Sequence, residues 1–235
     1  MRIDGSTALV TGANRGIGRH FARHLLERGA ARVYATARDP RTVDLPGVEV
    51  LRLDVTDPGS VAAAAEVAGD VALLVNNAGI NTAQDLVGGD LAKIRLEMDT
   101  HFYGTLDVVR AFAPVLAANG GGAIVNVLSA LSWFSAPGTG AYAAAKAAQW
   151  GLTNGIRLEL AGQGTLVTAL HLGSADTDMI AGTGLDPINQ PADVARAALD
   201  GVEAGAVEVL VDDWSAHVKA SLAGDPAVFY RDLVG

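Results

Sequence analysis

The sequence predicts an α/β fold built on one doubly wound parallel sheet. Short runs of β-branched and other apolar residues alternate with longer Ala-rich segments along all 235 residues. Most of the short runs are continuously apolar, which is typical of strands covered on both faces. Alternating strands and helices give βαβ units, and right-handed crossovers then favour a single sheet of about seven strands with helices on both faces.

The strands are expected at residues 7–10, 32–36, 48–53, 71–75, 123–128, 165–170 and 207–211. The helices are expected at residues 16–29, 57–68, 90–118, 140–161 and 191–201. Asp57-Pro58 provides a cap followed by a proline at one helix start, and Gln190-Pro191 starts another. Pro114 lies inside a helical pattern and is expected to bend that helix or end it early.

Composition narrows the range of functions. Half of the residues are apolar, the net charge is −9, and only 18% of residues are charged, which argues against a nucleic-acid partner. The absence of Cys excludes disulfides, thiolate metal sites and Cys nucleophiles. We see neither a signal peptide nor an apolar stretch of about 18 residues, so we expect a cytoplasmic protein without a membrane span.

The chain shows no linker or repeat, so we expect residues 1–235 to form one domain. The substrate site of such a domain lies at the C-terminal ends of the strands. Residues 181–190 are rich in Gly, Asp, Asn and Pro. We therefore expect the segment 178–190 to act as a mobile lid over the substrate.

A glycine-rich loop follows the first predicted strand. Gly12-Ala-Asn-Arg-Gly16-Ile-Gly18 joins that strand to the first helix. Glycines here permit a sharp turn and the close approach of a pyrophosphate, while the helix N-terminus offers free N–H groups to an anion. The spacing G-x-x-x-G-x-G differs from the usual G-x-G-x-x-G fingerprint, so the loop alone is also compatible with plain turn chemistry.

A tyrosine and a lysine share one face of the predicted helix 140–161. Tyr142 and Lys146 are four residues apart. A phenol has a pKa of about 10 and is a poor catalyst at neutral pH, but a neighbouring ammonium favours its ionised form. Ser129 ends the strand before this helix, where its hydroxyl could polarise a carbonyl. Taken alone, the pair is also compatible with an ordinary pair on a helix surface.

Together these residues resemble the short-chain dehydrogenase/reductase family. The shared pattern is Thr11-Gly12-x3-Gly16-x-Gly18, then Asn76-Asn77-Ala78-Gly79, Ser129 and Tyr142-x3-Lys146, in the family order over residues 7–211. The ordered set is far more specific than any one motif. The resemblance implies a Rossmann-type fold and an oxidoreductase that moves a hydride between a nicotinamide and a carbonyl or alcohol carbon. It also implies a small-molecule carbonyl or alcohol substrate and a homodimer or homotetramer.

The resemblance assigns roles to individual residues. Tyr142 would be the general acid in reduction and the base in oxidation, Lys146 would bind the nicotinamide ribose and lower the tyrosine pKa, and Ser129 would orient the substrate. Asp54 would contact adenine and Thr177 the carboxamide. The residues expected to bind the cofactor are Gly12, Asn14, Arg15, Gly16, Ile17, Gly18, Arg38, Asp54, Val55, Asn77, Ala78, Gly79, Tyr142, Lys146, Gly173 and Thr177.

Two positions depart from the family pattern. His101 stands where the family usually carries a fourth catalytic residue, an Asn that holds a water in the proton relay. His101 could serve the relay or simply pack, and both readings stay open. Leu172-Gly173 replaces the usual Pro-Gly, which should loosen the turn that enters the nicotinamide region.

The end of the second strand bears on the choice of cofactor. Small Ala37 occupies the place of an acid that would accept from the 2′-hydroxyl of NAD, and Arg38 follows it. Arg15 adds a second guanidinium suited to a 2′-phosphate. These residues favour NADP (NADPH) over NAD. The alternatives are that both arginines are solvated surface charges, or that Asp39 turns inward.

Two further pairs of residues could in principle bind a substrate or a metal ion. Trp133 and Phe134 lie between Ser129 and Tyr142 and either pack a loop or line an apolar substrate pocket. His20 and His24 have i, i+4 spacing, but no third ligand is evident and no metal is expected.

Three other functions are compatible with parts of this pattern. The first is a catalytically weak dinucleotide-sensing regulator on the same fold, which would be expected to lack Ser129, Tyr142 or Lys146. Sugar-nucleotide epimerases and dehydratases usually carry a different glycine loop and a longer C-terminal region. Divergent enoyl reductases space Tyr and Lys more widely.

Overall fold

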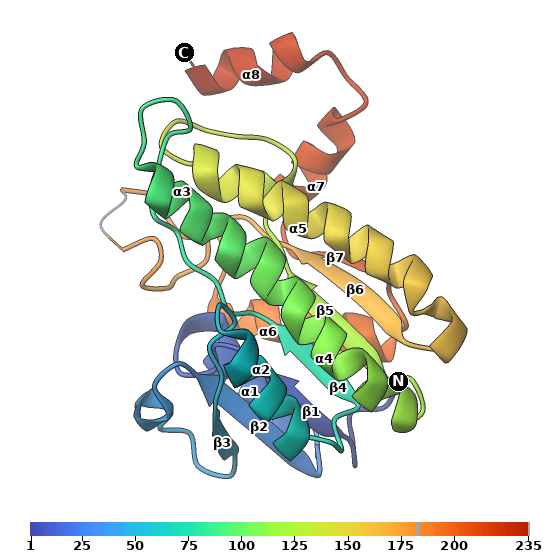
Figure 1. Ribbon diagram of the computed structural model, residues 1–235. Helices are drawn as coiled ribbons and strands as arrows, with labels where there is room; N and C mark the ends of the chain where they lie inside the picture. The colour runs from blue at the N-terminus through green and yellow to red at the C-terminus, as the bar shows by residue number, and fades with distance from the viewer. Residues whose placement is uncertain (182–183, 235) are drawn as a thin grey trace.

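The computed structural model describes residues 1–181 and 184–234. A single parallel sheet of seven strands runs through it in the order β3-β2-β1-β4-β5-β6-β7, with helices on both faces (Figure 1). The strands are β1 (Thr7–Val10), β2 (Arg32–Ala37), β3 (Glu49–Arg52), β4 (Leu73–Asn76), β5 (Ala123–Val127), β6 (Leu166–His171) and β7 (Glu208–Leu210). The predicted Rossmann-like doubly wound fold and its seven strands are confirmed.

The helices are α1 (Gly16–Glu27), α2 (Pro58–Val67), α3 (Leu91–Met98), α4 (Gly104–Ala118), α5 (Gly140–Glu159), α6 (Pro191–Glu203), α7 (Asp213–Ser221) and α8 (Pro226–Val234). Local chemistry explains where they begin. Asp57 accepts hydrogen bonds from Gly59 N and Ser60 N at 3.0 and 3.2 Å and so caps α2 as predicted. Pro191 occupies the first turn of α6, where its missing N–H has no helical partner to lose.

Two apolar layers hold the sheet between the helices. On one face, Phe21 and Leu25 of α1 and Leu199 of α6 pack against strand residues such as Val10. On the other face, α2, α4 and α5 pack against the sheet through residues that include Phe112, Leu116 and Ile156. Burial on both faces explains why the central strands β1, β4 and β5 are mostly apolar, whereas the edge strand β3 is largely exposed.

The predicted helix 90–118 is interrupted. A π-helical segment, η2 (Asp99–Tyr103), separates α3 from α4, and such bulges often occur at functional sites. Pro114 does not end α4, which continues to Ala118, so of the two outcomes that we expected, a bend or an early end, the early end does not occur. Pro114 is exposed, and buried Phe112 and Leu116 on either side hold the helix against the sheet.

Helices α7 and α8 were not predicted. They extend beyond the carboxyl end of the sheet (Figure 1). Trp214 and Phe229 of these helices meet Phe134 with ring centroids 5.9 and 5.5 Å apart. Within the described residues, no helix is long and apolar enough to span a membrane.

The chain order reverses between β1 and β4. The strands β1, β2 and β3 run outward in one direction, and the chain then returns to place β4 on the other side of β1. In open α/β sheets, ligands bind at the carboxyl ends of the strands beside such a switch point. The site residues should therefore gather at this edge.

Candidate active site

The glycine loop occupies the switch point and is held there by the Asn77 side chain. Asn77 Nδ2 donates to Thr11 O at 2.9 Å and to Gly12 O at 3.1 Å. Thr11 Oγ1 in turn accepts from Asn77 N and Ala78 N, at 2.9 and 3.0 Å. These bonds join the end of β1 to the end of β4, so Asn77 and Ala78 shape the loop.

Two of the loop positions require glycine for different reasons. Gly12 has a φ of +64°, a region that disfavours other residues. A Cβ on Gly18 would lie 2.2 Å from Gly12 O and 2.4 Å from Asn77 Nδ2. The first turn of α1 therefore packs directly on the loop, while Arg15 at its N-cap provides no side-chain cap. The free N–H groups of this helix start fit a phosphate.

The two arginines predicted to bind a 2′-phosphate have different surroundings. Arg38 is exposed after the end of β2. Arg15 Nη1 pairs with Asp178 Oδ2 at 3.1 Å, so its guanidinium turns toward the segment after β6. Asp39 caps its own short turn and accepts from Arg41 N, Nε and Nη2 at 2.9–3.1 Å. Asp39 therefore does not turn inward as an NAD-type acid would.

Asp54 and Val55 lie just beyond β3. Asp54 Oδ1 accepts from the backbone and hydroxyl of Thr56 at 3.0 and 2.8 Å. Val55 is buried and lies against Gly104 at the start of α4, where a Cβ would come 3.0 Å from the valine side chain. Both residues border the edge where adenine was expected.

The structure brings Ser129, Tyr142 and Lys146 together. Ser129 follows β5 and caps the short turn Ala130–Ser132, with its Oγ accepting from Leu131 N at 3.1 Å. Tyr142 and Lys146 lie on α5, with the ammonium nitrogen 5.6 Å from the centre of the phenol ring. Lys146 Nζ donates to Val127 O at 2.7 Å and to Gln149 Oε1 at 2.9 Å.

The pKa values of this pair follow from burial. Burial raises the pKa of Tyr142 well above its usual value, the charge of Glu97 raises it further, and Ser129 opposes the shift. Burial lowers the pKa of Lys146 to about 7, against the opposing charge of Glu97. The direction for Tyr142 is the reverse of the lowering that we expected, because burial and the charge of Glu97 outweigh the hydrogen bond with Ser129.

His101 lies in the π-helical segment and faces the tyrosine. Its ring is edge-on to the Tyr142 ring, with the centroids 5.3 Å apart. His101 Nε2 is 2.8 Å from Ile80 O and 3.3 Å from Glu97 Oε2. A Cβ on Gly79 would lie 2.7 Å from the imidazole, so this glycine leaves room for the ring. His101 therefore lies directly beside Tyr142, the candidate proton donor.

The aromatic pair after Ser129 is engaged in packing. Trp133 stacks on His171 with centroids 3.8 Å apart and meets Trp150 edge-on at 6.2 Å. Phe134 joins the aromatic cluster of α7 and α8. His171 Nδ1 lies 3.1 Å from Ser129 O, and burial lowers the pKa of this histidine to about 4. A neutral His171 thus supports the backbone of Ser129.

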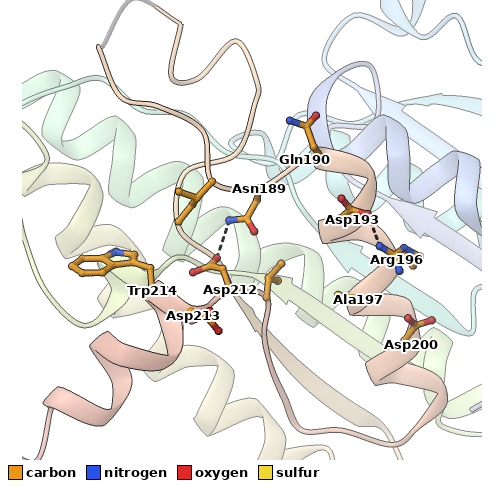
Figure 2. Close-up of a pocket in the computed structure, with 11 residues that line it drawn as sticks. Asn189, Gln190, Asp193, Arg196, Ala197, Asp200, Asp212, Asp213 and Trp214 are labelled. Atoms are coloured by element: carbon orange, nitrogen blue, oxygen red, sulfur yellow. Dashed lines mark hydrogen bonds and ion pairs between the residues drawn. The ribbon is translucent and has the colours of Figure 1, made fainter.

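The segment after β6 lies over the glycine loop. A Cβ on Gly16 would be 3.3 Å from the Thr177 side chain. Gly173 N donates to Asp212 Oδ2 at 2.8 Å, so the turn that we expected to loosen is held at this point. Asn189 Nδ2 also donates to Asp212 at 2.8 Å, which ties down the other end of the segment (Figure 2).

The predicted lid 178–190 lies mostly within this segment, and its residues 182–183 fall outside the described residues. Its base is closed by bonds from Ile188 N and Asn189 N to Ser174 O, at 3.2 and 3.1 Å. A cavity of about 660 Å³ between this base, α6 and α7 contains Asp212 and Trp214 (Figure 2). It includes none of Ser129, Tyr142 and Lys146, so it is separate from the catalytic residues.

Sequence reasoning missed four residues that hold the site together. They are Glu97, Gln149, His171 and Asp212. Two of them had a signal in their spacing: Glu97 is four residues before His101, and Gln149 is three residues after Lys146. The other two come from strand ends far along the chain.

The histidines of α1 have other partners. His20 Nδ1 lies 2.9 Å from Arg23 and His24 Nδ1 lies 2.7 Å from Glu27. Over residues 1–181 and 184–234, no group of three or more potential ligands is placed to hold a metal ion.

Comparison with known proteins gives the family. The short chain dehydrogenase model matches residues 6–187. The chain is 35% identical over 189 residues to the galactitol 2-dehydrogenase (L-tagatose-forming) of Cereibacter sphaeroides, covering 76% of this chain and 74% of that protein. It is 34% identical over 178 residues to the NADPH-dependent 1-acyldihydroxyacetone phosphate reductase of Schizosaccharomyces pombe, covering 72% and 60%.

Solved structures of short chain dehydrogenases share the fold of this chain. A short chain dehydrogenase from Burkholderia cenocepacia J2315, crystallised in complex with NADP, matches with a TM-score of 0.94 and 37% identity over 100% of both chains. A short chain dehydrogenase/reductase from Burkholderia phymatum, in complex with NAD, shares the fold with a TM-score of 0.84 and 24% identity, covering 95% and 93%. Fold and site together define a Rossmann-type oxidoreductase. The chain belongs to the short-chain dehydrogenase family.

Proposed function

We propose that this protein is an NADP(H)-dependent carbonyl reductase or alcohol dehydrogenase. The observation that carries the proposal is the convergence of Ser129, Tyr142 and Lys146 at the carboxyl edge of the sheet, beside the glycine loop. Residues 1–235 would form one cofactor-binding domain, with the segment 178–190 as the substrate lid.

Each catalytic side chain has a task that its position permits. Ser129 Oγ would hold the substrate oxygen and polarise the carbonyl. Tyr142 Oη would give its proton to that oxygen in reduction and take it back in oxidation. The raised pKa of Tyr142 keeps the phenol protonated at neutral pH, as a general acid must be. When bound, the nicotinamide would supply or accept the hydride.

The cofactor fits the residues at the switch point. The glycine loop and the uncapped start of α1 would hold the pyrophosphate. The backbone near Ile17 would join the glycine loop in holding the pyrophosphate, and Asn14, Asp54 and Val55 would border the adenosine half. Asn77, Ala78, Gly79, Gly173 and Thr177 would border the nicotinamide half, and Lys146 would bind its ribose.

NADP is the cofactor that we propose, with NAD as the alternative. Ala37 leaves room for a phosphate, Arg15 and Arg38 supply positive charge, and Asp39 is held by Arg41. Two of the similar proteins are also described with NADP or NADPH. An ion pair as exposed as Arg15–Asp178 is worth only about 0–1 kcal/mol, so a phosphate could displace it.

The substrate would be a ketone or aldehyde with an apolar side. Phe134, with Trp214 and Phe229, forms an apolar aromatic group after the turn that carries Ser129, and the neighbouring Trp133 stacks on His171. These rings would serve as one wall of the substrate pocket.

We also propose a homodimer or homotetramer, as the family resemblance implied. Tyr103 between α3 and α4 and Leu158 on α5 are exposed, at 54% and 80%. Large apolar side chains on helices that face away from the sheet are suited to a helix–helix interface. Size-exclusion chromatography with light scattering tests this; a monomer at micromolar concentration would contradict it.

The function is tested by following oxidation of NADPH and of NADH with a panel of ketones, aldehydes and imines. We expect turnover with a carbonyl substrate and a preference for NADPH. Tyr142→Phe should lower the rate by at least about 100-fold while leaving NADPH binding intact, because it removes only the proton donor. Binding of NADPH without turnover of any substrate would instead favour the dinucleotide-sensing regulator.

A further inference from the structure

Glu97 and His101 form a fully buried pair beside the catalytic tyrosine. Both side chains are 0% exposed, and Glu97 Oε2 lies 3.3 Å from His101 Nε2. Burying a carboxylate costs several kcal/mol unless partners compensate, and apolar residues of similar volume often stabilise a core as well or better. Packing alone therefore does not explain two ionisable groups at this place.

The bonds of the pair fix which imidazole nitrogen carries a proton. Glu97 Oε1 accepts from Thr82 N at 2.5 Å, which leaves Oε2 facing His101. His101 Nε2 faces two acceptors, Ile80 O at 2.8 Å and Glu97 Oε2 at 3.3 Å, against one more distant donor, Ile80 N at 3.4 Å, so we assign the proton to Nε2. His101 Nδ1 then holds a lone pair, and within the described part of the chain it has no hydrogen-bond partner. A buried acceptor without a donor points to a proton or a water that reaches it during function.

The surroundings connect this free nitrogen to the chemistry. The π-helical segment presents the ring edge-on to Tyr142, at 5.3 Å between centroids. The positive charge of Lys146 lowers the pKa of His101, as burial does more strongly, while Glu97 raises it. The imidazole thus lies within electrostatic range of both members of the catalytic pair.

We propose that His101 Nδ1 is the proton acceptor behind Tyr142 and Lys146, and that Glu97 is a positioning residue that stabilises the imidazolium. In alcohol oxidation, the phenolic O–H bond of Tyr142 breaks first, and its proton moves along the Tyr142–Lys146 pair, directly or through a water, to form an N–H bond at His101 Nδ1. The resulting phenolate then takes the proton of the substrate hydroxyl as that O–H bond breaks. Reduction runs the same transfers in reverse. An Asn at this position could hold a water but could not take the proton.

The charge of Glu97 shifts the pKa of three titrating groups of the site in the same direction. Its charge raises the pKa of His101, Tyr142 and Lys146. Replacing it by the neutral Gln should lower all three. The rate profile of Glu97→Gln should therefore move to lower pH, by about one unit if the lost interaction is worth about 1.4 kcal/mol.

The first experiment, which rests on the proposed function, compares pH–rate profiles of the full-length protein. His101→Asn should lower kcat by about tenfold or more and remove the pH limb that His101 controls. Glu97→Gln should keep that limb and shift it downward. The exposed His217→Asn serves as the control. A purely structural pair would lower the rate equally at all pH values, and a profile of unchanged shape in both variants overturns the proposal.

The second experiment does not need turnover. The chain has five histidines, so their ring nitrogens are resolvable by ¹⁵N NMR, with His101→Asn assigning the signal. We expect an Nε2–H tautomer for His101 at neutral pH, protonation of Nδ1 at lower pH, and a lower midpoint in Glu97→Gln. A ring protonated first at Nε2, or insensitive to Glu97, overturns the relay even where carbonyl reduction is observed. Absence of turnover in the wild type would refute the proposed function instead.

Discussion

Replacing Gly18 by Ala should damage the cofactor loop directly. The added methyl carbon would lie 2.2 Å from the carbonyl oxygen of Gly12 and 2.4 Å from the amide nitrogen of Asn77. The Gly12 oxygen belongs to the backbone, so it cannot rotate away as a side chain could. Asn77 could move only by giving up its bonds to Thr11 O and Gly12 O.

The magnitude follows from these contacts. Inserting a methyl group into a packed site costs about 1–3 kcal/mol, and each lost hydrogen bond adds about 1 kcal/mol. With both bonds of Asn77 lost, we therefore expect a loss of about 3–5 kcal/mol in the free energy of unfolding. For a domain of this size that lowers the Tm by roughly 6–20 °C. The affinity for NADPH should fall by at least about tenfold, because the loop can no longer close around the pyrophosphate.

The assay is thermal denaturation together with calorimetric titration of NADPH. Gly151→Ala is the matched control, since Gly151 lies inside α5 and a Cβ there meets nothing within 4 Å. That change should stabilise the protein by about 0.5–1 kcal/mol. If Gly18→Ala keeps wild-type stability and NADPH affinity, the close packing of helix α1 on the loop is not what forms the site.

Three further predictions concern charge. Burial lowers the pKa of Lys146 to about 7 from 10.5, so the unfolded chain binds more protons between these pH values and stability should rise with pH there. Denaturant unfolding should show this slope, and Lys146→Met should remove it; an equal slope in the variant would contradict the assignment. Arg15→Ala and Arg38→Ala should each weaken NADPH at least about fivefold while leaving NADH nearly unchanged, measured by fluorescence titration; equal losses for both cofactors would exclude a 2′-phosphate contact. Asp178→Asn should strengthen NADPH binding slightly, by less than about fivefold, because it frees Arg15 from an exposed partner; weaker binding would show that Asp178 helps hold the cofactor.

The strands and the glycine loop could be predicted because their signals are local. A strand buried on both faces must be apolar throughout, and the turn before α1 needs glycine at Gly12 and Gly18 whatever the rest of the chain does. The helical spacing of Tyr142 and Lys146 likewise fixed their common face. The ends of helices shifted by a residue or two, as fraying ends do.

Features that depend on contacts between residues far apart in the chain could not be predicted from the sequence. Asp212 reaches back 39 residues to hold Gly173 N, so the turn is fixed despite the missing proline. The direction of the Tyr142 pKa depends on burial and on Glu97, whose place in the core the pattern of α3 does not reveal. α7 has little amphipathic pattern of its own, and its buried Ser215 and Val218 pack only in the folded chain.

The position of Glu97 also bears on the pH ranges of the two directions of the reaction. Its negative charge keeps the proton on Tyr142, which favours the general acid needed for carbonyl reduction over the base needed for alcohol oxidation. Reduction should therefore persist into the alkaline range, while oxidation should keep rising with pH as the phenol ionises. In Glu97→Gln the rise of the oxidation rate should begin at lower pH, because the phenol then loses its proton more easily. An oxidation profile that starts at the same pH in both proteins would mean that the Glu97 carboxylate does not act on the tyrosine.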